Sequence, residues 1–301
     1  MKAPFKPMLI SNKKMDFKEA TYPLIVTKKY DGVRVEVTNK GLYNRSFKKM
    51  GNKELQAKFE ALCYDVPEGV ALEGEVYKDG VEPYVIGGVC NRSKADSDVD
   101  GYKIMLFDRY DTNDKGRDWS YRRAILDMYD DLHDDVEVVK TWVVNSYEEL
   151  MTLYKETLDE GLEGLVVVNP KGVYHEGRVS NRMNIIYKLK PFVTQDLPIL
   201  GVNERMRNTN ESLTNELGHS YKRNTVDAKE GTGLAATFLC RLPNGKDVKV
   251  TITGSEDYRK GVWDDRDSFI GCYAEVESMK SGAKDSLRFP SLVRVKGRVE
   301  K

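Results

Sequence analysis

The sequence predicts an α+β protein with two domains: an N-terminal domain of antiparallel sheets with flanking helices, then a C-terminal β-barrel. Three observations support this prediction. The chain has 301 residues, a length that fits two domains. Residues 1–190 combine apolar strand-like runs with amphipathic helical segments. Residues 191–301 hold short strand-like runs separated by turns, so the boundary is placed at Lys190-Pro191.

The composition is that of a globular protein with a sizeable core. Apolar residues make up 40% of the chain and charged residues 32%. No run of eighteen apolar residues exists, and the first fifteen residues contain no continuous apolar block, so we expect neither a membrane span nor a secretory signal. The four cysteines are scattered and never form C-x-x-C. They support neither a disulfide framework nor a zinc site, and they favour a reducing, cytoplasmic setting.

Charge is distributed unevenly, although the net charge is zero. Residues 1–60 hold 14 Lys and Arg against 6 Asp and Glu, whereas residues 111–160 hold 6 against 14. Such segregation predicts a basic face and a remote acidic one. A basic face fits a nucleic-acid partner, and chance unevenness of a solvated surface is the alternative.

One charged segment, Lys29-Tyr30-Asp31-Gly32-Val33-Arg34, lies between two strand-like runs, residues 24–26 and 33–37. It is therefore predicted to form a tight loop between two strands. Gly32 allows the backbone to bend or to approach a ligand closely. A lysine held beside other cations has a lowered pKa and can act as a nucleophile, so Lys29 is a candidate catalytic residue. A charged β-hairpin without chemistry is the alternative.

Acidic residues interrupt or precede two further strand-like runs. Glu73 and Glu75 lie within residues 70–77, and Glu163 comes directly before the apolar run 164–168. Burial of unpaired carboxylates is costly, so Glu73 and Glu75 are expected to face a metal ion or a group of cations. A solvated strand edge is the alternative.

Alternating lysines mark residues 185–190. Period two places Lys188 and Lys190 on the same face of a strand. Two lysines beside apolar neighbours need anions, which the carboxylates named above or a phosphate would provide. A solvated strand face is the alternative.

Helices and the second domain follow from local patterns. Apolar spacing predicts helices over residues 53–63 and 119–132, and Ser146 with Glu149 forms a capping box that begins a third. The second domain has four strand-like runs and an Asn-Gly hairpin signal, which together predict a small barrel of the OB type. The four runs are residues 199–202, 234–242, 248–253 and 272–278. Residues 205–233 form a long polar insertion, which is typical of a functional loop.

In this order, the motifs resemble those of the nucleotidyltransferase superfamily of ATP-dependent DNA ligases and mRNA capping enzymes. The layout is similar to that of the minimal two-domain DNA ligases of viruses and phages, and the resemblance extends from residue 7 to about residue 298. The segments that carry it are residues 29–34, 73–75, 107–108, 163–164, 188–190 and 288–296, with the ligase-specific Asn44-Arg45-Ser46. Lys296 departs from the family pattern, which ends in Arg, and Arg298 is the alternative there.

The resemblance implies a nucleotidyltransferase (ATP-grasp-like) domain over residues 1–190. It implies an OB-fold domain over residues 191–301, with residues 205–233 as a DNA-encircling latch. The implied activity is that of an ATP-dependent DNA ligase, which seals 3′-hydroxyl/5′-phosphate nicks in duplex DNA through a lysyl-AMP and a DNA-adenylate. An RNA ligase or an mRNA capping guanylyltransferase is the alternative. The implied cofactors are ATP and Mg²⁺ (or Mn²⁺). The resemblance also implies that the protein is a monomer in the cytoplasm of a bacterial or virus-infected cell and that it does not contact a membrane.

The resemblance also implies roles for single residues. Lys29 would carry AMP, and Lys188 and Lys190 would hold the phosphate of that AMP. Lys188 and Lys190, together with Arg34 and a divalent ion, are expected to lower the pKa of Lys29. Asp31 would place the metal or the leaving group, and Glu75 and Glu163 would bind Mg²⁺ or orient the ribose. Thr27 would contact adenine, and Phe107 would stack on it. Arg45 would hold the 5′-phosphate of the nick, and Arg288 and Lys296 would approach the pyrophosphate.

Overall fold

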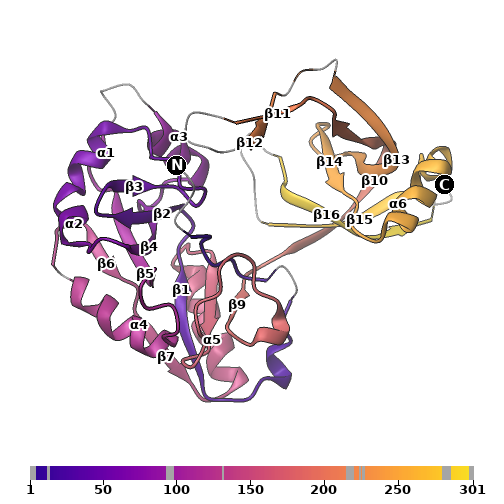
Figure 1. Ribbon diagram of the computed structural model, residues 1–301. Helices are drawn as coiled ribbons and strands as arrows, with labels where there is room; N and C mark the ends of the chain where they lie inside the picture. Colours follow the sequence, from indigo (N-terminus) through magenta and orange to yellow (C-terminus); the bar gives the residue numbers. More distant parts are fainter. Residues whose placement is uncertain are drawn as a thin grey trace. The chain divides into compact units, whose positions relative to one another are not determined.

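The structure is a computed structural model that describes residues 5–11, 14–92, 98–130, 132–214, 220–223, 225, 228–279 and 286–297. The chain divides into two compact units, the first ending at Lys190 and the second beginning at Pro191 (Figure 1). Among the described residues, no helix is both long and apolar enough to cross a membrane.

The described part of the first unit contains two β-sheets. One has the strand order β3-β2-β4-β5-β6, and the other has the order β7-β1-β8-β9. β5 and β6 run parallel, so the prediction of antiparallel sheets is wrong at this edge. The strands are β1 (Leu24–Lys29), β2 (Val33–Thr38), β3 (Gly41–Tyr43), β4 (Val70–Tyr77), β5 (Lys103–Asp111), β6 (Val136–Val138), β7 (Thr141–Val144), β8 (Gly164–Val168) and β9 (Ile186–Leu189).

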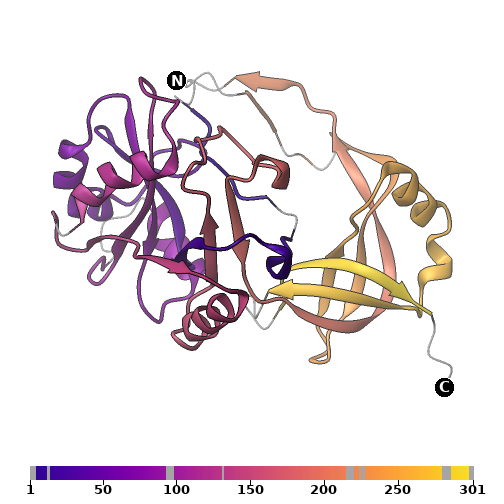
Figure 2. The ribbon, with the colours of Figure 1, turned by 90° about the horizontal axis from the view of Figure 1, so that it is seen from below.

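Helices cover these sheets, as Figures 1 and 2 show. Leu55, Leu62 and Ile86 of α1, α2 and α3 pack into the core of the five-stranded sheet, and Leu150 of α5 packs into the core of the other. The helices are α1 (Lys53–Lys58), α2 (Glu60–Asp65), α3 (Pro83–Asn91), α4 (Trp119–Leu126) and α5 (Tyr147–Asp159), with short 3-10 turns η1 (Phe17–Glu19), η2 (Asp127–Tyr129) and η3 (Asn181–Met183).

Two of the three predicted helices have different bounds. The first is broken at Phe59, which leaves helical angles while its ring stays buried, so α1 and α2 replace one helix. The second ends at Leu126. Of the residues expected to continue its apolar face, Tyr129 packs against the core, whereas Met128 and Leu132 are exposed. Asp130 has an extended backbone, and its carboxylate accepts a hydrogen bond from the Val138 backbone N–H. The predicted capping box before α5 is confirmed in part: Ser146 Oγ accepts from the Glu149 backbone N–H, but the Glu149 carboxylate accepts from the backbone N–H of Asn145 and not of Ser146.

The second unit is a closed barrel with the strand order β10-β13-β14-β16-β15 in its described residues. Phe238, Val250 and Val276 are among its fully buried side chains. The predicted Asn-Gly hairpin joins β13 to β14, with Gly245 at a φ of 81°. β16 was not predicted as a strand. The elements are β10 (Val193–Asn208), β11 (Ser212–Thr214), β12 (Ser220–Lys222), β13 (Lys229–Arg241), β14 (Asp247–Thr251), α6 (Glu256–Asp264), η5 (Arg266–Phe269), β15 (Tyr273–Met279) and β16 (Arg288–Lys296).

The polar segment 205–233 is more regular than the predicted loop. β10 and β13 extend into it, and Asn208 pairs with Lys229 at the far end of their ladder. β11 and β12 then pair with each other. Backbone hydrogen bonds between strands therefore order much of a segment that has few apolar side chains to bury. Residues 215–219, 224 and 226–227 of this prediction, like Arg298 of the last motif, lie outside the described residues.

Candidate active site

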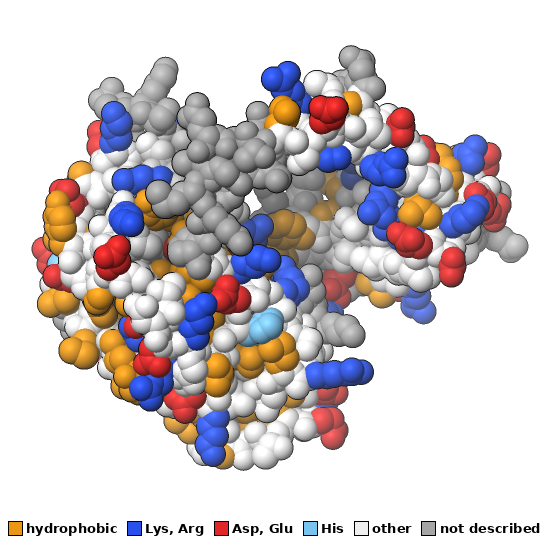
Figure 3. Space-filling view, in the orientation of Figure 1, with side chains coloured by type: hydrophobic (Ala, Val, Ile, Leu, Met, Phe, Trp, Pro, Cys, Tyr) orange, Lys and Arg blue, Asp and Glu red, His pale blue; other side chains and the backbone are white. Residues whose placement is uncertain are grey.

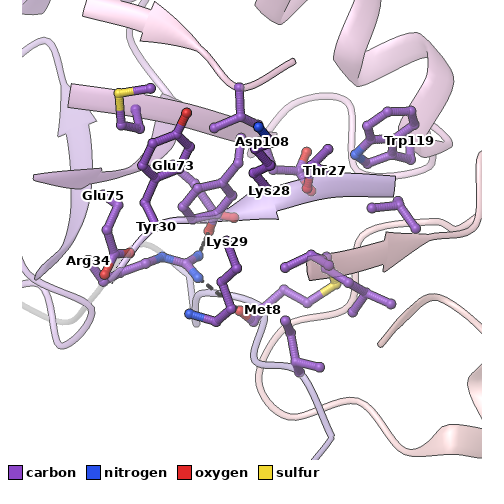
Figure 4. A pocket seen from close by; sticks show the side chains of 17 residues that line it. Met8, Thr27, Lys28, Lys29, Tyr30, Arg34, Glu73, Glu75, Asp108 and Trp119 are labelled. Atoms are coloured by element: carbon purple, nitrogen blue, oxygen red, sulfur yellow. Dashed lines mark hydrogen bonds and ion pairs between the residues drawn. The ribbon is translucent and has the colours of Figure 1, made fainter. Parts of the chain in front are cut away.

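A pocket opens between the two sheets of the first unit (Figure 4). Its lining comes from β1, β8 and β9 of one sheet and from β2, β4 and β5 of the other. Glu75 and Arg34 lie at one side of the view with Lys29 next to them, and Trp119 lies at the other side. The apolar lining consists mainly of Met105, Trp119, Val139, Val166, Val168 and Ile186. The pocket therefore has a charged end and an apolar end.

Lys29 is the last residue of β1, and its backbone pairs with Gly164 at the start of β8. The backbone N–H of Glu163 donates to the Lys29 carbonyl at 2.9 Å, so both side chains begin from adjacent points. The Lys29 amine donates to Glu163 Oε2, and the Lys190 amine lies 3.3 Å from Glu163 Oε1. Three residues from three predicted motifs therefore form one ion-pair cluster.

Close backbone contacts explain the glycines of two motifs. A Cβ atom at Gly32 would lie 2.1 Å from the Val76 carbonyl oxygen. A Cβ atom at Gly164 would lie 2.2 Å from the Leu189 carbonyl oxygen, and Gly164 also has a φ of 141°. Only glycine fits at these two positions beside Lys29.

The pKa of Lys29 shifts in the direction opposite to the prediction. Burial lowers the pKa of its amine, but the carboxylates of Glu163, Glu75 and Asp31 outweigh burial and raise that pKa above its usual value. The prediction that neighbouring cations lower it is therefore wrong for the protein alone, because Glu163 lies between Lys29 and Lys190. Burial raises the pKa of the Glu163 carboxyl group, but Lys29 and Lys190 outweigh burial and lower it.

Lys188, like Glu163 and Lys190, does not line the pocket, but its amine lies near enough to these two residues and Lys29 to interact with their charges. It lies on β9 opposite Val166 of β8. Burial together with the nearby Lys190, Arg178 and Lys29 lowers the pKa of its amine. The predicted pair of lysines therefore gathers beside Lys29, and the solvated-face alternative is wrong because both side chains are partly buried.

Glu75 reaches the charged end from β4. Burial raises the pKa of its carboxyl group to about 7 against the attraction of Lys29 and Arg34, and Glu163 and Asp31 add to the rise. Two carboxylates, Glu75 and Glu163, thus act on the same amine. No group of three or more His, Cys, Asp or Glu side chains able to hold a metal ion occurs in the part of the chain that the structure describes.

Thr27 and Phe107 also line the pocket. Thr27 precedes Lys29 by two residues in β1 and is 5% exposed. Phe107 lies on β5, next to Asp108, whose carboxylate forms a two-point ion pair with Arg122 at 2.8 and 2.9 Å. Arg122 belongs to α4, so this pair ties the helix that carries Trp119 to the strand that carries Phe107.

Arg34 lies deeper and binds three protein groups. Its Nε lies 3.1 Å from Glu36 Oε1, and its Nη2 lies 2.8 Å from Glu73 Oε1. Its Nη1 donates to the Met8 carbonyl at 3.3 Å (Figure 4). The guanidinium carbon lies 4.8 Å from the centroid of the Phe107 ring. The prediction that Glu73 faces a cation is confirmed.

Buried carboxyl groups outnumber the guanidinium groups beneath the pocket. Glu36, Glu73 and Asp108 face Arg34 and Arg122, and all three carboxyl side chains are nearly inaccessible. Burial and the adjacent Glu73 raise the pKa of Glu36 well above its usual range, despite Arg34. Burial also raises the pKa of Glu73, against Arg34 and with the help of Asp108. Burial and the mutual repulsion of these carboxyl groups therefore raise the pKa of both Glu36 and Glu73.

Three predicted site residues belong neither to the pocket nor to the group of charged residues around Lys29. Arg45 is exposed on the segment between β3 and α1 and does not line the pocket. Arg288 and Lys296 lie on β16 of the second unit, where the Lys296 amine pairs with Asp196 at 2.8 Å.

Sequence reasoning missed Glu36, Trp119, Arg122 and Tyr174. Tyr174, which donates to Glu73, is 101 residues from it, so no local pattern relates them. Glu36 could have been found, because period two places it on the same face of β2 as Arg34.

Residues 7–190 match the family described as the ATP dependent DNA ligase domain, which is more than half of the chain. The chain belongs to this family. All the residues that line the pocket fall within the matched stretch, whereas Arg288 and Lys296 do not.

DNA ligases of viruses and phages are similar to the chain in sequence. The DNA ligase of African swine fever virus (strain Badajoz 1971 Vero-adapted) is 25% identical over 245 residues, which cover 78% of this chain and 52% of that protein. The DNA ligase of Enterobacteria phage T4 is 31% identical over 84 residues, which cover 28% of this chain and 16% of that protein. The chain thus matches about half the length of the first relative and about a sixth of the second.

Solved structures of ligases share the fold of this family member. A Chlorella virus DNA ligase-adenylate has a TM-score of 0.54 and 20% identity, with 99% of this chain and 100% of that chain covered. A Lig E DNA ligase has a TM-score of 0.68 and 18% identity, with 96% and 98% covered.

Proposed function

We propose that this chain is an ATP-dependent DNA ligase that seals 3′-hydroxyl/5′-phosphate nicks in duplex DNA through a covalent lysyl-AMP. The observation that carries the proposal is the place of Lys29, in a pocket with one charged and one apolar end. The charged end suits phosphates and the apolar end suits a purine. Membership of the ligase-domain family supports the same reaction.

In the first step, the Lys29 amine attacks the α-phosphorus of ATP. A nitrogen–phosphorus bond forms and pyrophosphate leaves. The amine must first lose the proton that the carboxylates hold on it in the protein alone, and Glu163, which accepts its hydrogen bond, would be the nearest acceptor once a bound ligand changes the charge balance. Lys188 and Lys190 stabilise the negative charge that builds on the phosphate oxygens.

In the second step, AMP passes from Lys29 to the 5′-phosphate at the nick, which breaks the nitrogen–phosphorus bond and forms an anhydride. In the third step, the 3′-hydroxyl loses its proton and attacks that 5′-phosphate, and AMP leaves. Each step builds charge on a phosphorus held in line between two groups, so Lys188 and Lys190 serve throughout.

The apolar end would hold the base. Phe107 would stack on adenine and Thr27 would contact its edge, since both line the pocket. Glu75 or Glu163 would orient the ribose, and Asp31 would help to place the leaving group.

Mg²⁺ (or Mn²⁺) fits the charged end. Glu75 and Glu163 both act on the Lys29 amine, and Mg²⁺ needs only one or two carboxylates because waters and phosphate oxygens complete its shell. These two residues would hold the ion, which would neutralise phosphate charge when bound.

Arg45 would hold the 5′-phosphate of the nick. Its loop is well defined, because Asn44 Oδ1 accepts from the backbone N–H groups of Ser46 at 2.9 Å and Lys48 at 3.2 Å. Arg45, Lys48 and Lys49 are exposed and form no ion pair with a described residue. Such phosphate contacts are independent of sequence and sensitive to salt.

The first unit would be the adenylylation domain and the second an OB-fold domain, for which the closed five-stranded barrel is the support. Arg288 and Lys296 would approach the pyrophosphate in the first step, which requires domain closure. The segment 205–233 would act as a latch on DNA, and the protein would work as a monomer.

Sealing of a nicked duplex tests this function. Protein freed of bound AMP is incubated with Mg²⁺, a nicked DNA duplex and ATP, GTP or NAD, with Lys29→Ala as the inactive control. We expect joining with ATP only and none by the variant. Covalent labelling from GTP instead of ATP would favour the capping alternative, and joining of RNA but not DNA would favour an RNA ligase.

A further inference from the structure

Glu36 is a buried acid at a costly position. Its side chain is fully buried on β2, directly opposite Glu73 of β4 in the strand register. A buried acid destabilises a fold unless a partner uses it, and an apolar side chain of similar size would be cheaper. Its Oε1 accepts from Arg34 Nε, whereas its Oε2 has no hydrogen-bond partner among the described residues. The side-chain hydrogen bond that Glu36 accepts within the described part of the chain thus comes from Arg34.

Arg34 is fixed in its plane by three contacts. Glu36 accepts from Nε, the Met8 carbonyl accepts from Nη1, and Glu73 forms an ion pair with Nη2, which has no hydrogen-bond partner among the described residues. Because a guanidinium group is planar, the two hydrogen bonds and the ion pair together limit its orientation. Arg34 therefore has little freedom to follow a substrate.

The fixed guanidinium supports the Phe107 ring. Its central carbon lies 4.8 Å from the ring centroid, within the range of a cation–π contact. Phe107 also lines the pocket, so the orientation of its ring sets the surface offered to a ligand.

We infer that Glu36 is a positioning residue for nucleotide binding: it orients Arg34, which in turn holds Phe107 in place as the platform for the base. The inference rests on the proposed function, since the base belongs to the ATP that Lys29 attacks. Glu36 touches neither the nucleotide nor the reacting atoms, so its effect is on the affinity for ATP and not on the chemical step.

Single-turnover self-adenylation of AMP-free protein, followed across ATP concentrations, tests this inference. The variants are Glu36→Leu, which removes the acceptor, and Glu36→Gln, which keeps an oxygen for Arg34 Nε. Phe107→Leu and the double variant Glu36→Leu/Phe107→Leu complete a cycle. Thr157→Val is the control for loss of a buried polar group, because Thr157 is fully buried in α5 and its hydroxyl donates to the Leu153 carbonyl.

We expect Glu36→Leu to raise the ATP concentration for half-maximal rate about tenfold, as for a weakened base–aromatic stack, with the limiting rate little changed. Glu36→Gln and Thr157→Val should stay close to wild type. In the Phe107→Leu background, Glu36→Leu should have almost no further effect.

Equal effects of Glu36→Leu in both backgrounds would overturn the inference, as would a lower limiting rate at unchanged ATP dependence. Neither result would affect the proposed function. An absence of labelling by the wild-type protein would instead contradict the proposed function and with it the inference.

Discussion

Lys29 and Arg34 are two cations five residues apart, and each lies between carboxylates in a different way. Lys29 contacts Glu163 at the charged end of the pocket, and a quarter of its side chain is exposed. Arg34 contacts Glu36 and Glu73, whose side chains are at most 1% exposed. The first cluster can exchange partners with a ligand, whereas the second cannot do so without exposing buried acids.

This difference indicates that the Lys29 cluster takes part in the reaction, whereas the Arg34 cluster holds the structure around it. The Lys29 cluster holds a primary amine beside a carboxylate that can take its proton, and it has two more lysines within reach. The Arg34 cluster has a guanidinium with its nitrogens engaged and an aromatic ring on its face. Substitutions in the first should therefore abolish the reaction and spare the fold. Substitutions in the second should lower stability and weaken the binding of ATP, with the limiting rate little changed.

The largest effects are expected when each of the two cations, Lys29 and Arg34, is exchanged for the other type of cation. Lys29→Arg keeps a positive charge beside Glu163 but removes the nucleophilic amine, so labelling from ATP should fall by about 10³-fold or more. Arg34→Lys keeps the charge but loses the planar fork, so the free energy of unfolding should fall by about 1–3 kcal/mol. Denaturant unfolding and single-turnover labelling measure the two effects.

Either of two results would contradict this contrast between Lys29 and Arg34. Labelling of Lys29→Arg at the wild-type rate would remove Lys29 from the chemistry. An unchanged unfolding free energy for Arg34→Lys would remove the structural role of the buried cluster.

Lys188→Met comes next in size and tests how far the reactive cluster extends. Loss of one charge that stabilises the phosphate should slow labelling by about 10²-fold, and sealing of a pre-adenylated nick should slow as well. Lys171→Met, at an exposed turn, is the matched control. Equal rates for the two variants would restrict the cluster to Lys29, Glu163 and Lys190.

Glu75 lies between the two clusters, because both Lys29 and Arg34 act on it. Its pKa is raised from 4.5 to about 7 in the folded protein, so the folded state binds a proton more tightly than the unfolded chain between these values. Stability from this group is present below about pH 4.5 and is lost as the pH rises to about 7. Glu75→Gln should therefore stabilise the protein by up to about 3 kcal/mol at pH 8 and little at pH 4.5.

Unfolding by urea at the two pH values measures this difference, with the exposed Glu68→Gln as the control. A stability difference between Glu75→Gln and wild type that does not change with pH would contradict the raised pKa. Labelling by Glu75→Gln should be reduced at both values.

The smallest effect is expected at Lys296, a third cation between carboxylates but on the surface of the barrel. It pairs with Asp196 and Glu275 while 38% of its side chain remains exposed. Lys296→Ala should slow labelling from ATP a few-fold, leave the thermal unfolding midpoint unchanged and spare the sealing of a pre-adenylated nick. Slower sealing of that nick would show that Lys296 does not act on the pyrophosphate.

Most of the reactive cluster was predictable from the sequence, because its residues lie in short motifs whose glycines and strand periods fix local geometry. Lys29, Glu163 and Lys190 meet as expected. The direction of the Lys29 pKa shift was not predictable, because it depends on which charge lies nearest to the amine. The sequence offered two lysines and three acids, and the fold placed Glu163 in contact.

The buried cluster was less predictable, because long-range packing creates it. Tyr174 reaches Glu73 and Arg122 reaches Asp108 only once the sheets have formed. The barrel shows the same limit at β16, because Pro290 interrupts the strand pattern and the pairing with β15 completes the strand.

The covalent intermediate can be located directly. AMP-free protein is incubated with ATP and Mg²⁺, digested, and the peptides are sequenced by mass spectrometry under conditions that preserve a phosphoramidate. We predict one AMP per chain, attached to Lys29, and its loss when nicked DNA is added. An adduct on another residue, or sealing of nicks without any adduct, would contradict the role of Lys29.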